Sequence, residues 1–109
     1  MNSKRKGCQG ERELAAELRK YGYDTHRGQQ FQGGVDSPDV YGLPGIHIEC
    51  KRVEKLNLAT AYTQATRDAA GQKIPAVFHR RNREKWMVTL SLGDFMEIYG
   101  AWQQRSFTG

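Results

Sequence analysis

The chain has 109 residues, of which 38% are hydrophobic and 27% are charged, and its 17 Lys and Arg exceed its 12 Asp and Glu to give a formal net charge of +5. This length allows one domain around one modest core, so we expect a single domain over residues 1–109. No apolar run approaches the roughly 20 residues of a membrane span, and the basic start is not followed by the apolar segment of a secretory signal. We therefore expect a cytoplasmic protein without a membrane, and the positive charge favours a polyanionic partner.

The two cysteines, Cys8 and Cys50, are expected to be free thiols in a reducing compartment. Cys50 falls on the apolar face of a predicted strand, where a buried thiol behaves as a small hydrophobic side chain. The chain has no CxxC or HxxxH spacing, which argues against a structural zinc site.

The first predicted helix covers residues 9–21, because Leu14, Leu18 and Tyr21 recur at helical spacing and Gly22 follows as a stop. Residues 1–7 are basic and precede it, either as an arm that contacts phosphates or as a frayed terminus. Glu11 falls on the same helical face as Leu14 and Leu18. Either the helix dipole stabilises this acid in the first turn, or it is a functional carboxylate at the rim of the core.

A short strand is predicted over residues 23–27, followed by the glycine-rich loop GQQFQGG at residues 28–34. This loop is either a connector or a flap over a substrate, with Phe31 able to contact a base or ribose. Asp36 follows it and competes with Asp39 as a functional aspartate. We prefer Asp39, because Pro38 fixes an extended approach to the next strand.

The central prediction is a hairpin in which PDVYG and IHIECK form antiparallel strands around the turn LPG. Alternation along the second strand places Ile46, Ile48 and Cys50 on one face and His47, Glu49 and Lys51 on the other.

This hairpin brings Asp39 beside Glu49, and two adjacent carboxylates are costly unless a positive group lies between them. Mg²⁺ suits such a pair, and Lys51 on the same face can orient an attacking water. This is the chemistry of phosphodiester hydrolysis. An exposed strand face with alternating charges is the simpler alternative, and His47 is interpreted as a structural residue.

A second helix is predicted over residues 58–70, with a buried stripe that includes Ala61, Ala65 and Ala69, and with Gln64 at its edge. A strand over residues 74–80 follows, parallel to the hairpin strand through a right-handed crossover. The basic turn RRNREK then leads to a strand over residues 86–92. This turn is either a solvated charge run or a phosphate clamp, and we prefer the clamp because its charges are dense and positive.

The chain ends with a short predicted helix capped by Ser91 or Asp94, in which Phe95, Ile98 and Tyr99 close the core. The tail over residues 100–109 contains Trp102 and Phe107 with little to bury them. Exposed aromatic side chains on a small chain indicate a partner surface, such as that of a second subunit.

The order of these motifs resembles the PD-(D/E)xK nuclease superfamily. The signature residues are Pro38-Asp39 and then Glu49-Cys50-Lys51. The opening sequence KRKGCQGERELAAELRKYGY is similar to the start of archaeal-type Holliday junction resolvases, and GIHIECKRVEKLNLATAYTQATRDA is similar to compact resolvase-like nucleases of phages. The resemblance covers residues 4–99 and implies an α/β, restriction-endonuclease-like fold: a mixed central sheet flanked by helices in the order αβββαββα.

The resemblance further implies Mg²⁺-dependent hydrolysis of DNA in bacterial or phage-infected cytoplasm, with Mn²⁺ able to substitute. Asp39, Glu49 and the backbone carbonyl of Cys50 would hold the metal, Lys51 would orient the water, and Glu11 would complete the site or a second metal position. Gln64 is a secondary catalytic candidate. The expected DNA contacts are Lys4, Arg5, Lys6, Arg12, Arg52, Arg67, Arg80, Arg81, Arg83 and Lys85.

A Holliday junction resolvase must cut two strands symmetrically, so the resemblance implies a homodimer acting on a four-way junction. Three alternatives remain open at this point. The chain could be a non-specific or restriction-like nicking nuclease, a DNA-binding module without catalysis, or a nuclease that cuts RNA.

Overall fold

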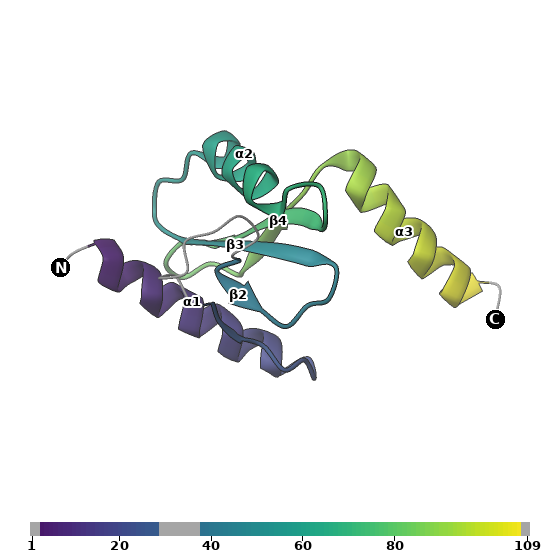
Figure 1. Cartoon of the computed structure of the whole chain (residues 1–109). Coiled ribbons are helices and arrows are strands. Elements are labelled where there is room, and N and C mark those ends of the chain that lie inside the picture. Colours follow the sequence, from purple (N-terminus) through teal and green to yellow (C-terminus); the bar gives the residue numbers. More distant parts are fainter. Residues whose placement is uncertain (1–2, 29–37, 108–109) are drawn as a thin grey trace.

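The computed structural model describes the backbone of residues 3–28 and 38–107, and the side chains of residues 8–28 and 38–105. Three helices and five strands follow one another in the described chain (Figure 1). They are α1 (Ser3–Arg19), β1 (His26–Arg27), β2 (Val40–Tyr41), β3 (Ile46–Arg52), α2 (Leu58–Ala69), β4 (Ile74–Arg80), β5 (Met87–Thr89) and α3 (Leu92–Phe107). The expected order αβββαββα is confirmed.

The five strands form one mixed sheet in the order β1-β2-β3-β4-β5. β2 pairs antiparallel with both β1 and β3, so the predicted hairpin is confirmed. β3 and β4 run parallel over seven residue pairs, from Ile46 beside Ile74 to Arg52 beside Arg80, as the intervening helix predicted. β5 adds an antiparallel edge strand to β4.

The two faces of the sheet are covered by different helices. On the α1 face, a buried cluster joins α1 to the sheet, with Leu14 packed among Val40, Ile48, Cys50 and Phe78. On the α2 face, Ala61 and Ala65 pack on Val77 of β4. The small alanine side chains let α2 lie close to the sheet, so β3 is covered from both sides.

Helix α2 has clear end signals. Asn57 caps its start by accepting a hydrogen bond from the backbone N–H of Thr60 at 3.0 Å. Ala70 follows the last turn in the left-handed conformation with φ of 53°, and Gly71 continues the turn with φ of 73°. The helix therefore ends one residue before the predicted boundary.

Helix α1 differs from its prediction at both ends. It begins at Ser3 rather than at residue 9, so residues 3–7 belong to the helix and not to a separate arm. It ends at Arg19, two residues before the predicted end, so Tyr21 lies outside the helix and is 73% exposed. The predicted strand over residues 23–27 is reduced to β1, because the chain before it turns back on α1 and Thr25 donates a hydrogen bond to the carbonyl of Ala15 at 2.7 Å.

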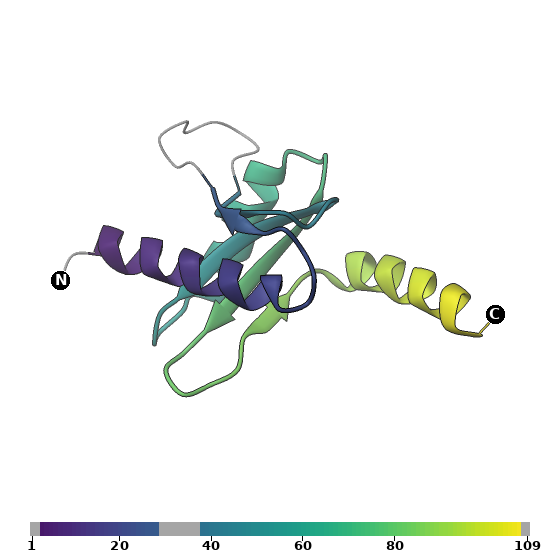
Figure 2. The same cartoon turned by 90° about the horizontal axis from the view of Figure 1, so that it is seen from below.

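The end of the chain also departs from the sequence prediction. The strand predicted over residues 86–92 is only β5, with Val88 exposed while Trp86 and Leu90 pack against the α1-side core. Helix α3 continues through residues 100–107, and it extends away from the sheet instead of folding onto it (Figure 2).

The prediction that Phe95, Ile98 and Tyr99 close the core is therefore wrong. These side chains remain 47%, 42% and 38% exposed. The core is already covered by α1 and α2, and α3 leaves the sheet directly after Leu90 and Ser91.

Candidate active site

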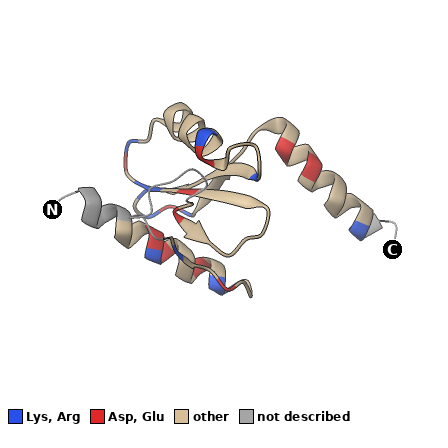
Figure 3. Cartoon of the chain, in the orientation of Figure 1, with Lys and Arg blue, Asp and Glu red and all other residues tan. Residues whose placement is uncertain are grey.

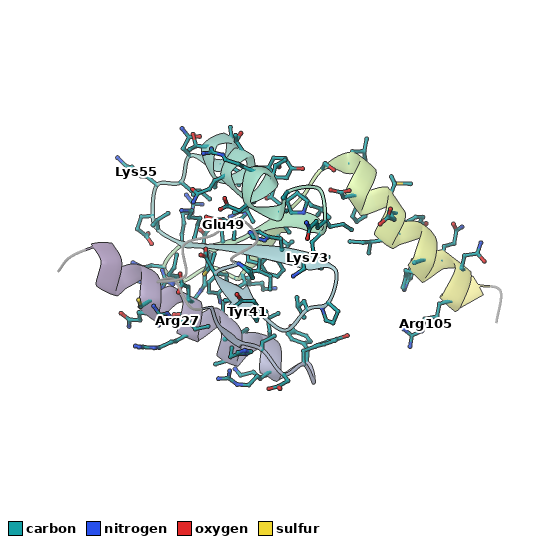
Figure 4. All side chains as sticks on the ribbon, viewed as in Figure 1. Arg27, Tyr41, Glu49, Lys55, Lys73 and Arg105 are labelled. Atoms are coloured by element: carbon teal, nitrogen blue, oxygen red, sulfur yellow. The ribbon has the colours of Figure 1, made fainter. Side chains whose placement is uncertain are left out.

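Strand β3 carries the central acid. Its alternation directs Ile48 and Cys50 into the α1-side core, while Glu49 pairs in register with Val77, the residue on which α2 packs. Glu49 is only 4% exposed and lies between β3 and α2 (Figure 4). Lys51 shares this face, and its Nζ lies 3.6 Å from the Glu49 carboxylate. A Glu49–Lys51 ion pair therefore runs from the buried part of this face to its partly exposed end.

Asp39 is held beside this strand by two backbone contacts. Its own N–H donates to the carbonyl of Ile48 at 2.9 Å, and its Oδ2 accepts from the backbone N–H of Cys50 at 2.7 Å. Because Cys50 lies between Glu49 and Lys51, the hairpin fixes the Asp39 carboxylate against the signature segment. The geometry predicted for Asp39 and Glu49 is thus present in the fold.

The electrostatics of Glu49 reflect this crowding. Burial first, and then the neighbouring Asp39 carboxylate, raises the pKa of Glu49 to about 7, against the opposing effect of Lys51. Asp68 on α2 also raises the pKa of Glu49. A cation bound here would offset the repulsion, because a positive charge favours the ionised carboxylate.

Glu11 reaches the same aspartate from α1. Burial and the Asp39 charge raise the pKa of Glu11, while Arg27 and Lys51 lower it. The guanidinium of Arg27 donates to the Glu11 carboxylate at 2.9 Å and to the Cys8 sulfur at 2.7 Å. Since α1 begins at Ser3 and has no acid in its first turn, the first-turn interpretation of Glu11 is wrong.

A close helix–strand contact sets the position of Glu11. A Cβ built on the preceding residue, Gly10, would lie 2.6 Å from Cβ of Arg52 on β3. Real Cβ atoms do not approach one another so closely, so only glycine permits this distance between α1 and β3. The sequence contained this signal, but its meaning depends on a contact between distant segments.

The other expected site residues are more dispersed. Gln64 is exposed on α2, one turn before Asp68, and Arg67 is exposed on the same helix. The Cys50 thiol faces the α1-side core, and burial raises its pKa, so it is a structural thiol. Asp36, residues 29–34 of the predicted loop with Phe31, and the side chains of Lys4, Arg5 and Lys6 lie outside the described residues, so the predictions for them stay predictions.

Three of the expected DNA-contacting arginines are used within the fold. Arg52 and Arg80 both contact Glu13 of α1, the former at 3.3 Å, and Arg81 donates to Glu84 at 3.0 Å. The remaining four candidates make no ion pair with another described residue and are exposed. These are Arg12, Arg67, Arg83 and Lys85.

Sequence reasoning missed one constellation. His47 is fully buried on β3, and it lies with Glu49 and Asp68 so that one ligand atom from each falls within 4.8 Å of the others. Asp68 gave no sequence signal, because an acid near the end of a helix is ordinary. Arg27 was also missed, because its partner Glu11 is sixteen positions away in the sequence.

The whole chain matches a known protein family. The family model described as "Phage putative PDDEXK endonuclease" matches residues 2–108. The chain belongs to this family.

A solved structure supports the assignment. Hjc, a Holliday junction resolvase from the archaeal hyperthermophile Archaeoglobus fulgidus, is 28% identical, with a TM-score of 0.59 over 78% of this chain and 72% of Hjc. The expected relationship to phage and archaeal-type PD-(D/E)xK nucleases and the expected fold are thereby confirmed. A search of curated proteins finds no match. Within the described residues, no helix has the length and apolarity needed to span a membrane.

Proposed function

We propose that this PDDEXK endonuclease is a Mg²⁺-dependent Holliday junction resolvase that cleaves DNA as a homodimer. The observation that carries the proposal is the hydrogen bond from the backbone N–H of Cys50 to Asp39, which fixes one carboxylate beside Glu49 and Lys51. The family match supports nuclease chemistry, and the similarity to Hjc supports a branched DNA substrate.

The donor set suits a hard divalent cation. The carboxylates of Asp39 and Glu49 and the backbone carbonyl of Cys50 would hold Mg²⁺, with Mn²⁺ able to replace it. When bound there, Mg²⁺ would supply positive charge to offset the charge on the scissile phosphate and would make a water easier to deprotonate. These oxygen donors fit Mg²⁺, because it favours carboxylates and otherwise keeps its water ligands.

The protein groups then have separate tasks. The Lys51 ammonium lies at the half-exposed end of the site, where it can donate to an attacking water or to a phosphate oxygen. Glu11, held by Arg27, adds a carboxylate on the α1 side of Asp39 and would complete the site there. Gln64 would contact the substrate from α2 as a secondary group.

The exposed basic residues would bind the phosphate backbone. Arg83 and Lys85 project from the β4–β5 turn, and Arg12 and Arg67 lie on the two helices. Arg52, Arg80 and Arg81 are already paired with acids, so each contact of theirs with DNA would compete with an internal ion pair. We therefore assign most of the salt-dependent affinity to Arg12, Arg67, Arg83 and Lys85, which make no ion pair with another residue that the structure describes.

Helix α3 is the surface through which we propose that two copies meet. Its exposed apolar side chains share one side of the helix: Leu92, Phe95, Met96, Ile98, Tyr99 and Trp102. Each aromatic side chain has a surface of roughly 150–250 Å², and the three on α3 are about half exposed, so together they offer about 300 Å² of accessible surface per copy. With the aliphatic side chains added, two copies together could bury close to the roughly 1,000 Å² of a specific interface.

The charges of α3 favour an antiparallel pair of two α3 helices over binding to DNA. The helix has acids at Asp94 and Glu97 near its start and Arg105 near its end (Figure 3). In an antiparallel arrangement, Asp94 of one copy lies beside Arg105 of the other. A DNA phosphate backbone along α3 would instead meet the two negative side chains Asp94 and Glu97 and the single positive side chain Arg105, which disfavours binding.

The activity test compares a labelled four-way junction with linear duplex of the same sequence, in Mg²⁺ and in chelator, for wild type and Glu49→Ala. We expect paired symmetric nicks in the junction alone, lost in chelator and in the variant. Asp24→Asn, at an exposed acid, is the matched control and should cut normally. Equal cutting of both substrates would refute junction specificity, and junction binding without cleavage would indicate a DNA-binding module.

The dimer test uses Trp102→Glu and Ala101→Glu in sedimentation equilibrium. Ala101 projects from the opposite side of α3, so its variant adds the same charge outside the proposed interface. We expect Trp102→Glu to be monomeric and Ala101→Glu to remain dimeric. A dimer that survives Trp102→Glu would show that another surface joins the copies.

A further inference from the structure

We propose a second divalent-cation position, distinct from that held by Asp39 and the Cys50 carbonyl, formed by His47, Glu49 and Asp68 and selective for a first-row transition ion such as Mn²⁺ or Co²⁺. This second position adds to the proposed nuclease function, and a role of its ion in catalysis rests on that function. Its occupancy by metal can be measured without any cleavage.

The three donors come from two elements that pack against each other. His47 and Glu49 are two residues apart on β3, so they share the face that α2 covers. Asp68 comes from the last turn of α2. Their ligand atoms lie within 4.8 Å of one another, whereas ligands of a common ion with bonds of about 2.1 Å lie about 3 Å apart when adjacent and about 4 Å apart when opposite. A small inward movement of flexible side chains would therefore complete the site.

Burial makes this group unusual. His47 is 0% exposed and Glu49 is 4% exposed, while Asp68 is partly accessible and leaves a side open toward solvent. An imidazole and two carboxylates in an apolar layer are costly to bury, and a dication bound between them would stabilise both carboxylates. Glu49 would then serve both positions, with Asp39 on one side and Asp68 on the other.

The imidazole decides the metal preference. Mg²⁺ prefers oxygen ligands and retains water, whereas imidazole nitrogen suits later first-row ions, whose affinity rises from Mn²⁺ through Co²⁺. The Asp39 side offers only oxygen. The two positions therefore differ in chemistry, and Mg²⁺ is expected to fill the first without displacing Mn²⁺ from the second.

Helix α2 would link this position to substrate. Gln64 and exposed Arg67 lie on the same helix as Asp68. An ion that joins Asp68 to β3 would fix α2 against the sheet and, with it, the side chains that face DNA. This gives α2 a role that its apolar packing alone does not supply.

The test uses the untagged full chain and Mn²⁺ alone, with electron spin-echo detection of a coordinated imidazole nitrogen. The chain has three histidines, so His26→Gln and His79→Gln are matched controls for His47→Gln. We expect the nitrogen signal in wild type and in both controls, and its loss in His47→Gln. Asp68→Asn, at a less buried position, should raise at least tenfold the Mn²⁺ concentration needed for the nitrogen signal, and this can be measured even if His47→Gln fails to fold.

The outcomes separate this proposal from the nuclease proposal. A nitrogen signal that persists in His47→Gln, or that needs the same Mn²⁺ concentration in Asp68→Asn as in wild type, would overturn the second position while leaving Mg²⁺-dependent cleavage intact. Conversely, a His47-dependent signal in a chain that cuts no DNA would overturn the proposed function and keep the metal position.

Discussion

Replacing Glu49 by Gln should stabilise the metal-free protein at alkaline pH. The change keeps the shape of the side chain and removes a charge that is 4% exposed and next to Asp39. The folded chain raises the pKa of Glu49 from its ordinary 4.5 to about 7. The folded state therefore binds more protons than the unfolded state between these values, and its stability falls as pH rises through this window.

The magnitude follows from the same two pKa values. By linkage, the free energy of unfolding falls by about 2.5 kcal/mol between about pH 5 and about pH 8.5. This value is an upper bound, because water penetration and side-chain movement lower the cost of the buried charge. Glu49→Gln should lose this part of the pH dependence, so that its advantage over wild type grows with pH. Mg²⁺ bound at the site should also increase the stability of wild type at the higher pH values, because the cation favours the ionised Glu49 carboxylate.

The assay is urea unfolding of both proteins in chelator across this pH range, repeated for wild type with Mg²⁺. Asp24→Asn, at an exposed acid, should stay within about 0.5 kcal/mol of wild type at every pH. If Glu49→Gln and wild type lose stability in parallel from low to high pH, Glu49 does not carry the raised pKa and the argument from its burial is refuted.

Three further outcomes are expected. Lys51→Met should lower the cleavage rate by about 10²-fold or more while retaining DNA binding. The pH optimum of the variant should move upward, because Lys51 lowers the pKa of Glu49 and this effect is lost. An unchanged rate and pH optimum would remove Lys51 from the mechanism. Gly10→Ala should lower the free energy of unfolding, measured by thermal unfolding, by about 1–3 kcal/mol, because the added Cβ meets Arg52. Gly93→Ala, in helix α3, meets nothing within 4 Å and should raise the free energy of unfolding by about 0.5–1 kcal/mol. Equal effects would contradict the close α1–β3 contact. Arg83→Ala should reduce the slope of log affinity for DNA against log salt concentration by about one counterion. An unchanged slope would place the β4–β5 turn away from DNA.

Local patterns in the sequence predicted the signature hairpin. The Pro38-Asp39 pair, the LPG turn and the alternation around Glu49 depend on neighbouring residues, whose backbone geometry has a fixed period. The structure pairs these strands as expected. The position of the central acid was therefore accessible without knowledge of the remaining chain.

The surroundings of that acid were not accessible in the same way. Glu11 was singled out by helical spacing, but its partner Arg27 comes from strand β1, sixteen positions along the chain. Asp68 meets His47 and Glu49 only because small alanines bring α2 against β3. Contacts of this kind depend on distances between elements, which no local period encodes.

The end of the chain shows the same limit in another form. The apolar spacing of Phe95, Ile98 and Tyr99 correctly indicated a helix with one apolar side, but it did not specify what that side contacts. The prediction of a closed core was wrong because α1 and α2 already cover the sheet, and α3 leaves it after Ser91 (Figure 2).

The sequence by itself thus determined the order αβββαββα and the Asp39, Glu49 and Lys51 arrangement, because both follow from periodicity and turn chemistry within short segments. Only the tertiary structure decided which arginines are paired with acids, which residues surround Glu49 on the α2 face, and that α3 remains exposed. Those features arise from packing between segments far apart in the chain, where the burial of one surface determines which others stay uncovered.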